Sequence, residues 1–172
     1  LDFRRQRQMC IRDSIKCAQV LLSPDDTETR RRHLNARATL ATLIKSQVVP
    51  VINENDTVTT SEIKFGDNDR LAARVAQMSS SDLLILLSDI DGLYDQNPHY
   101  SNKAKHIPFV DEVNDDIINM AGSSNYEYAS GGMITKVEAA KISSLSGCAL
   151  IICNGEGKNP ILELSISFFL NK

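Results

Sequence analysis

Short apolar runs alternate with longer amphipathic stretches along this sequence. The apolar runs end at turn-forming or carboxylate-rich residues, as buried strands of a parallel sheet do; they cover Ile15–Leu22, Val48–Ile52, Leu83–Leu87 and Ala149–Cys153. The amphipathic stretches repeat apolar residues at the helical spacing of about 3.6 residues; they cover Thr27–Ser46, a helix from Asp67 or Asn68 to about Ser79, and Met133–Ser146, which Gly147 ends. This alternation predicts an α/β fold, a three-layer α/β/α sandwich with a mainly parallel sheet.

Several positions carry more specific expectations. Pro50 cannot donate to a strand ladder, so its strand is expected at a sheet edge or near its own end. The run Leu83–Leu87 is the most apolar in the chain and is expected to be covered on both faces. The predicted core positions are Leu34, Leu40, Ala41 and Ile44 in the first helix, and Leu71, Ala72, Val75 and Met78 in the second. Weaker patterns predict a turn at Ser23–Asp26, short strands at Thr57–Ile63, Ile107–Val110 and Ser165–Leu170, and short helices at Asp111–Met120 and Pro160–Leu164.

Composition narrows the class of protein. The 172 residues are 42% hydrophobic and 24% charged, enough for one globular domain with its own core. No apolar run reaches the ~18 residues needed to cross a membrane, and a net charge of −3 argues against nucleic-acid binding. Arg30–Arg32 is interpreted as a solvated helix face. The four cysteines have neither C-x-x-C spacing nor a dense disulfide pattern, so reduced thiols in the cytoplasm are expected.

Residues 1–14 differ from the rest of the chain. They contain arginines without the apolar segment that a signal peptide requires, and they fit no helical or strand periodicity. The stretch RQRQMCIRDS resembles translated sequencing adapter. A non-native extension is therefore predicted for residues 1–14, and the domain is expected to cover residues 15–172.

Two glycines precede the last long helix, in Ser130-Gly131-Gly132-Met133-Ile134-Thr135-Lys136. Glycines let the backbone approach an anion, and the start of a helix directs unpaired amides and its positive dipole end toward that anion. Lys136, in the first turn, can place a point charge on a phosphate. Ser88 and Asp89 directly follow an apolar strand, where α/β sheets hold ligands, and can hydrogen-bond a phosphate, ribose or base. A flexible loop with a surface lysine and an ordinary strand-end turn are the alternatives.

Two clusters of carboxylates and carboxamides also follow or begin regular elements. They comprise Asn53, Asn55 and Asp56 after the second strand, and Asn68 and Asp69 at the start of a helix. Asp56 can accept the ammonium of an amino acid, and Asn68 can donate to a carboxylate. Asp69 can form an ion pair that positions Lys136. Helix capping and turn formation are the alternative. The three histidines have no partners at ligand spacing, so no metal site is predicted.

Five motifs, in order, resemble the glutamate 5-kinases of the amino-acid-kinase superfamily. They are L-N-A-R at Leu34–Arg37, V-P-V-I-N-E-N-D at Val49–Asp56, G-D-N-D at Gly66–Asp69, L-L-S-D-x-D-G-L-Y at Leu86–Tyr94 and S-G-G-M-x-T-K at Ser130–Lys136. The resemblance runs from about Ile15 to Gly155. It implies the amino-acid-kinase fold, which is also that of carbamate kinase.

The resemblance also implies a reaction: ATP-dependent phosphorylation of the γ-carboxylate of L-glutamate with Mg²⁺, the first step of proline biosynthesis. It assigns glutamate binding to Asp56, Asn68 and Asn53, and nucleotide binding to Ser88, Asp89 and Ser130–Lys136. Lys136 would stabilise the transferred phosphoryl group, and Asp69 would organise catalytic lysines. A glutamate carboxylate, with a pKa of about 4.3, is already ionised at neutral pH, so no general base is required. Catalysis then rests on positioning and charge neutralisation.

The sequence departs from this family at both ends. The opening K-[LIV]-G-[ST] strand, a later serine-glycine loop, the closing glycine-threonine pair and a following PUA domain are not found. Residues 15–172 are therefore expected to form the C-terminal two-thirds of an incomplete kinase domain, with an exposed sheet edge and little turnover alone. Complete family members are usually homo-oligomers. Two alternatives remain: another amino-acid or carbamate kinase of this fold, and a module that binds amino acid or nucleotide without phosphoryl transfer.

Overall fold

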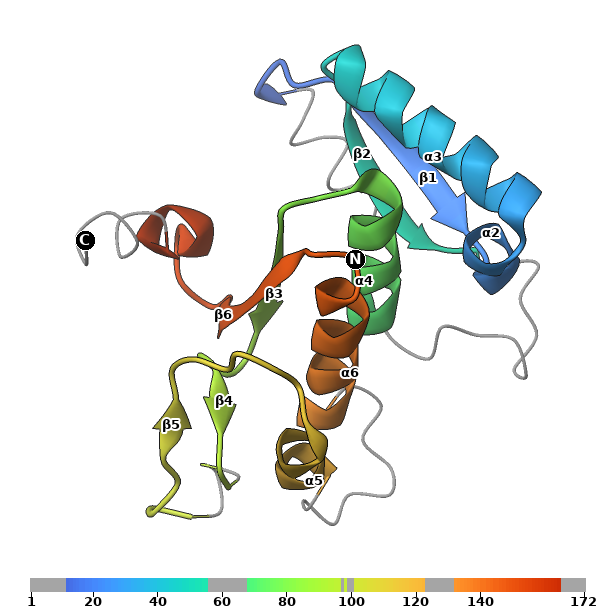
Figure 1. The fold of residues 1–172 in the computed structure, drawn as a ribbon. Helices are drawn as coiled ribbons and strands as arrows, with labels where there is room; N and C mark the ends of the chain where they lie inside the picture. The colour runs from blue at the N-terminus through green and yellow to red at the C-terminus, as the bar shows by residue number, and fades with distance from the viewer. Residues whose placement is uncertain (1–11, 56–67, 97, 99–100, 123–131, 165–172) are drawn as a thin grey trace.

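The computed structural model describes residues 12–55, 68–96, 98, 101–122 and 132–164. Their elements are β1 (Cys17–Leu22), α2 (Pro24–Glu28), α3 (Arg30–Lys45), β2 (Val49–Glu54), α4 (Asn68–Ser79), β3 (Leu83–Ser88), β4 (Leu93–Tyr94), β5 (His106–Ile107), α5 (Asp115–Gly122), α6 (Met133–Ser144) and β6 (Ala149–Asn154). Residues 160–164 are also helical. Figure 1 shows these elements in their spatial arrangement. The predicted alternation of strand and helix is confirmed, and the fold class is α/β.

The described strands form three two-stranded sheets. β1 pairs with β2 in parallel, from Cys17 opposite Val49 onward, and β3 pairs with β6 in parallel, from Leu83 opposite Ala149 onward. β4 and β5 form a small antiparallel pair. Both parallel pairs are connected through helices, as parallel pairing requires. The expected parallel pairing is therefore present, in two open sheets within the part of the chain that is described.

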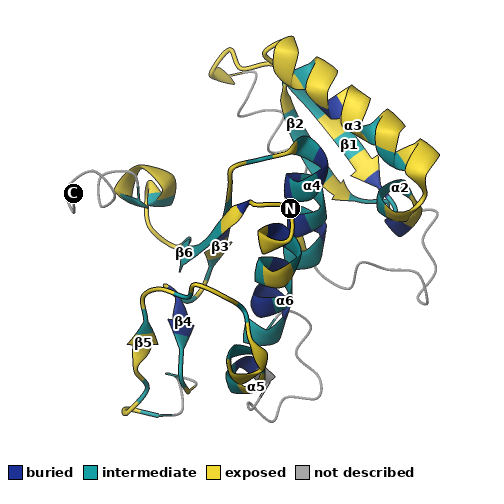
Figure 2. Ribbon diagram, viewed as in Figure 1, coloured by how far each residue is buried: buried dark blue, intermediate teal, exposed yellow. Residues whose placement is uncertain are grey.

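Helices cover one face of the parallel strands. One apolar cluster joins Val20, Leu22 and Ile52 of the first sheet to Ala36 of α3 and Leu71 and Val75 of α4. A second joins Leu84, Leu86 and Leu150 of the other sheet to Ala72 and Ala73 of α4 and Ala139 and Ile142 of α6. Since residues two apart in a strand share a face, these clusters define the covered face. Figure 2 shows buried positions concentrated on α4 and α6, whereas α3 is mostly exposed.

The opposite face of the strands is open in the described structure. Leu83 and Leu87 are 45% and 50% exposed, and Leu21 of β1 is 43% exposed. The expectation that Leu83–Leu87 is covered on both faces is therefore wrong for the described residues. Its physical reason is that α3, α4 and α6 all pack on the same side, so alternate leucines have no helix opposite them.

Helix α3 uses a narrower face than the sequence predicted. Leu40 is buried and Ala36 packs against the first cluster, but Leu34 and Ile44 are 51% and 56% exposed, and Ala41 is exposed too. The prediction of Leu34, Ala41 and Ile44 as core residues is therefore wrong. A helix that covers the edge of a two-stranded sheet buries only the narrow stripe that meets it.

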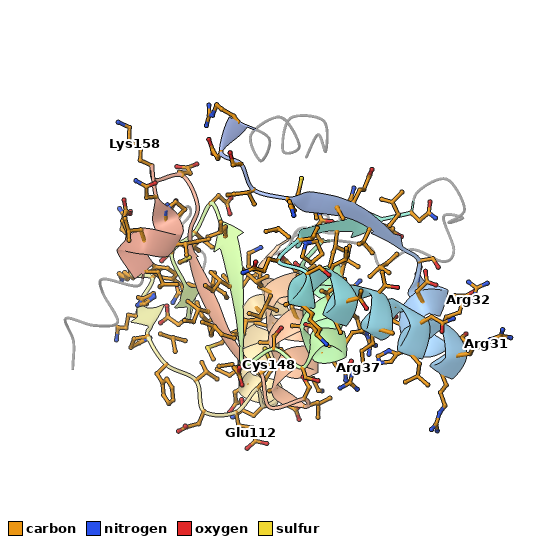
Figure 3. All side chains as sticks on the ribbon, turned by 90° about the horizontal axis from the view of Figure 1, so that it is seen from above. Arg31, Arg32, Arg37, Glu112, Cys148 and Lys158 are labelled. Carbon is orange, nitrogen blue, oxygen red and sulfur yellow. The ribbon has the colours of Figure 1, made fainter. Side chains whose placement is uncertain are left out.

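The arginine run lies on the outer side of α3. Figure 3 shows Arg31 and Arg32 projecting away from the rest of the molecule, and all three arginines are exposed. Arg32 Nη1 lies 3.4 Å from Asp25 Oδ2. The interpretation of Arg30–Arg32 as a solvated helix face is confirmed.

The boundaries of other elements differ by a few residues from those that the sequence predicted. The expected turn at Ser23–Asp26 is mostly helix α2, because Asp26 Oδ2 accepts hydrogen bonds from both the backbone nitrogen and the hydroxyl of Ser23. The strand predicted at Ile107–Val110 is limited to β5, and the following helix begins at Asp115. The strands predicted at Thr57–Ile63 and Ser165–Leu170 lie outside the described residues.

Strand β2 forms backbone hydrogen bonds with β1 along one edge, and its other edge faces away from β1. Val49 N donates to Lys16 O and Asn55 N donates to Leu22 O. In a parallel ladder, alternate residues point to opposite sides, so the backbone groups of Pro50 and Ile52 face away from β1. Pro50 thus lies on the outer edge of the β1–β2 pair, as its missing N–H predicted.

A cavity of about 610 Å³ lies beside this edge. Its lining includes Pro50 and Ile52 of β2, Leu83 and Ile85 of β3, and the side of α4 that packs on the strands, with Leu71 and Val75. The cavity extends to Asn53 at the end of β2 and to Asn68 at the start of α4. Asn53 and Asn68, which the sequence predicts to bind substrate, therefore line the same cavity.

Candidate functional site

Chain topology brings the candidate residues to one edge of the molecule. Helix α4 follows β2 and helix α6 precedes β6, and both helices run back along the strands (Figure 1). Their first turns therefore lie near the carboxyl ends of the parallel strands. This is the edge at which open α/β sheets bind ligands.

The first turns of α4 and α6 meet through an ion pair. Lys136 Nζ of α6 lies 3.0 Å from Asp69 Oδ2 of α4. The two side chains are only 10% and 20% exposed, respectively. A charged group with so little access to water requires a partner of opposite charge, and Lys136 and Asp69 are each other's partner. The predicted pairing of Asp69 with Lys136 is thus present in the structure.

Thr135 bonds to the same carboxylate. Its hydroxyl lies 2.9 Å from Asp69 Oδ2 and 2.8 Å from the backbone oxygen of Gly132. Thr135 is 7% exposed. A hydroxyl has a single hydrogen to donate, and both of its possible acceptors here are protein oxygens. In this arrangement Thr135 therefore donates within the protein.

Within the described residues, the start of α6 is open beside Gly132. Gly132 is the N-cap residue, with an extended backbone, and apart from its chain neighbours no described atom lies within 4 Å of the position that its Cβ would take. The first backbone N–H groups of α6 and the positive end of the helix dipole lie here. An anion could therefore reach the helix start close to the Lys136 ammonium.

Asn53 and Asn68 lie at the same strand-end edge. Both line the cavity between β2, β3 and α4. Asn68 is the first residue of α4 and directly precedes Asp69. The cavity is therefore next to Asp69, which pairs with Lys136. A molecule bound in this cavity would lie close to a phosphate bound at the lysine.

Ser88 and Asp89 lie at the carboxyl end of β3. The Ser88 hydroxyl donates to Asp89 Oδ1 over 2.9 Å, and Ser88 O accepts from Gly155 N at 2.7 Å. Ser88 is opposite Asn154 at the end of β6. These residues share the strand-end edge, and their role in nucleotide binding stays a prediction.

Three predicted site residues lie outside the described residues: Asp56, Ser130 and Gly131. Met133 and Ile134, predicted with the nucleotide loop, are part of the third apolar cluster, together with Val137 and Leu93. Their side chains therefore contribute to packing, while their backbone amides belong to the first turn of α6.

Sequence reasoning missed a second ion pair between the same helices. Arg70 of α4 donates from Nε and Nη2 to Glu138 Oε2 of α6, with the Nε contact at 2.7 Å. Arg70 directly follows Asp69 in sequence, and Glu138 lies two residues after Lys136. In α4 the acidic Asp69 precedes the basic Arg70, whereas in α6 the basic Lys136 precedes the acidic Glu138. This charge order could have suggested the second pair, but only once the two helices are known to be in contact.

Three of the cysteines lie within the described residues. Cys17, Cys148 and Cys153 are free thiols. Burial raises the pKa of the Cys148 and Cys153 thiols, so both favour the unreactive protonated form. Across the described residues, histidine, cysteine and acidic side chains do not gather in threes that could hold a metal ion.

Comparison with known proteins identifies the class. Residues 4–154 match the Amino acid kinase family. The match covers most of the 172 residues, and the chain belongs to this family. The family resemblance carried by the five motifs is thus confirmed.

The similar curated proteins share one enzyme name. The chain is 56% identical over 153 residues to "Glutamate 5-kinase 1" of Mesorhizobium japonicum, 58% identical over 147 residues to "Glutamate 5-kinase" of Nitrobacter hamburgensis, and 55% identical over 147 residues to that of Gluconobacter oxydans. The alignments cover 89%, 86% and 86% of this chain but 40%, 39% and 39% of those proteins, respectively. The chain therefore spans about two-fifths of the length of these relatives. No helix among the described residues is long and apolar enough to span a membrane.

Proposed function

We propose that this chain carries part of a kinase that transfers the γ-phosphoryl group of ATP to the γ-carboxylate of L-glutamate, the first step of proline biosynthesis. The observation that supports this most is the 55–58% identity to proteins named glutamate 5-kinase. The Lys136–Asp69 pair, between the first turns of α6 and α4, supports the proposal, because such a transfer needs a positioned positive charge. The proposal concerns the complete kinase domain, and this chain alone is expected to turn over little glutamate.

The reaction balances without a general base. An oxygen of the glutamate γ-carboxylate forms a bond to the γ-phosphorus, and the bond from that phosphorus to the β–γ bridging oxygen breaks. ADP leaves with the bonding electrons, and no proton moves, because a carboxyl group with a pKa of about 4.3 is already ionised. The protein has to position the reactants and neutralise charge. Lys136, oriented by Asp69, is the candidate for stabilising the transferred phosphoryl group.

Substrate and nucleotide are assigned to different sides of this lysine. Asn53 and Asn68, which line one cavity, and Asp56 are the proposed glutamate contacts. Ser88, Asp89 and the start of α6 are the proposed nucleotide contacts. Mg²⁺ is expected to arrive with ATP, because magnesium in kinase sites is held largely through substrate phosphates.

A chimeric enzyme tests the proposal. Residues 15–154 replace the matched stretch of the Mesorhizobium japonicum protein, and product is trapped as a hydroxamate with ATP, Mg²⁺ and hydroxylamine. Glutamate is expected to react, whereas aspartate and N-acetylglutamate are not. Preference for another acceptor would support a different amino-acid or carbamate kinase. Tight binding of ATP–Mg²⁺ without turnover, even in the chimera, would support a non-catalytic binding module.

Two wider properties belong to the same proposal. The complete protein is expected to be a homo-oligomer, which size-exclusion chromatography with light scattering would measure. A cytoplasmic location is expected because the thiols of Cys17, Cys148 and Cys153 are unpaired with one another. Fractionation of the source cells would check this location.

A further inference from the structure

Helices α4 and α6 contact each other at more than the Lys136–Asp69 pair. One turn further along, Ala73 and Ala139 are both fully buried in the same apolar cluster. Small residues at a crossing let two helices approach closely. The ion pair therefore lies at one end of a tight helix–helix contact, where small rotations of either helix would move the lysine.

The Arg70–Glu138 pair lies on another side of this contact. Successive residues of an α-helix are rotated by about 100°, so Glu138 points about 200° away from Lys136 around α6, and Arg70 about 100° away from Asp69 around α4. A single contact allows one helix to roll about its axis. Two polar contacts on different sides, with the buried alanines between them, fix both the roll and the slide of α6 against α4.

Thr135 restricts the carboxylate itself. Its hydroxyl and the Lys136 ammonium approach the same oxygen, Asp69 Oδ2, at 2.9 and 3.0 Å. Thr135 is also anchored to the helix start through the Gly132 backbone oxygen at 2.8 Å. Rotation of the Asp69 carboxylate would therefore break a bond to α6 as well as the ion pair.

We propose that Thr135, Arg70 and Glu138 are positioning residues, which hold Asp69 and the α4–α6 contact in the arrangement that presents the Lys136 ammonium to a phosphoryl group. This inference rests on the proposed kinase function and deepens it. It assigns the Thr135 hydroxyl to Asp69 rather than to the nucleotide. Arg70 and Glu138 act on the reaction only through Lys136, so their loss should change kcat more than substrate affinity.

Steady-state kinetics of Thr135 variants in the chimera test the first part. Thr135→Val keeps the shape but removes the hydroxyl, and should lower kcat about tenfold or more while the KM for ATP changes less than about twofold. Thr135→Ser, which keeps the hydroxyl, should recover most of that loss. Thr39→Val is the matched control, because Thr39 is exposed on α3, where its hydroxyl donates to the Asn35 backbone oxygen, far from the α4–α6 contact in sequence. A raised KM for ATP with unchanged kcat would make Thr135 a nucleotide contact and overturn the assignment.

Charge exchange tests the second part. Arg70→Gln and Glu138→Gln should each lower kcat about two- to fivefold, because both residues are partly exposed. The exchanged double variant Arg70→Glu with Glu138→Arg should restore kcat above either single charge reversal. Equal loss in the double and single variants would refute the positioning role, and this arm decides the question if Thr135→Val does not fold. A chimera that is inactive before any substitution would contradict the proposed function instead, so the two failures are distinguishable.

Discussion

Replacing Asp69 with asparagine isolates the charge of the carboxylate that pairs with Lys136. Asparagine has nearly the same size and keeps an oxygen that can accept from the Thr135 hydroxyl, so the substitution mainly removes the negative charge. The Lys136 side chain is 10% exposed and would then lack its counter-charge. The folded state should lose stability for this reason and not through loss of packing.

The magnitude follows from the burial of the pair. Exposed ion pairs contribute about 0–1 kcal/mol, and removing one partner of a fully buried pair costs about 3–5 kcal/mol. Side chains that are 10% and 20% exposed lie between these limits. Because hydrogen bonds to charged groups contribute about 1.5–3 kcal/mol, we expect Asp69→Asn to lower the free energy of unfolding by that amount. In a chain of this size, each kcal/mol corresponds to roughly 2–4 °C in Tm.

A double-mutant cycle measures the pair directly. Urea unfolding of Asp69→Asn, Lys136→Met and the double variant should give a coupling energy of about 1 kcal/mol or more. The control cycle is Asp25→Asn with Arg32→Gln, whose side chains are 60% and 55% exposed and 3.4 Å apart. Its coupling energy should be about 0.5 kcal/mol or less and should disappear in added salt, whereas the Asp69–Lys136 coupling should persist.

One result would refute this reasoning. If the coupling energy of Asp69 with Lys136 were no larger than that of Asp25 with Arg32, the lysine would not be held by the carboxylate. The geometry on which the site, the proposed reaction and the positioning residues depend would then be wrong.

Three further predictions concern the chimera and the chain itself. Lys136→Ala in the chimera should lower kcat far more than it raises the KM for glutamate, and Asp56→Ala should mainly raise that KM; steady-state kinetics check both. Burial raises the pKa of Cys148 above its ordinary value of 9.0, so its stabilising contribution is present below that pH and is lost as pH rises; Cys148→Ala should flatten the alkaline fall in unfolding free energy. Gly147→Ala should cost about 1–2 kcal/mol in urea unfolding, because Gly147 has φ +74°, whereas Gly132→Ala should cost little, since its backbone is extended and its Cβ position is open.

Several features of the fold could be predicted from local pattern alone. The periodicity of α4 placed Leu71 and Met78 in the core, and both are buried. Pro50 predicted an edge from its missing N–H, and Gly147, with φ +74°, predicted a helix end that the structure places slightly earlier, at Ser144. The motif order also predicted the family, which the match over residues 4–154 confirms.

The pattern could not predict how much of each apolar face is covered. Leu34 and Ile44 recur at helical spacing, and Leu83 and Leu87 belong to the most apolar run, yet all four are exposed. Burial depends on whether another element lies opposite a residue. That is decided by the arrangement of α3, α4 and α6 on one side of the strands, and not by hydrophobicity.

The sequence by itself determined the identity of the candidate residues and their place at helix starts and strand ends, because capping, dipole and strand-end positions are local properties. Apart from the Asp69–Lys136 pair, only the tertiary structure decided their partners. Thr135 and Asp69 are 66 residues apart, and Arg70 and Glu138 are 68 apart, so nothing local relates them. Their contacts exist because Ala73 and Ala139 allow α4 and α6 to approach closely, and side chains at the helix starts then meet at hydrogen-bonding distance.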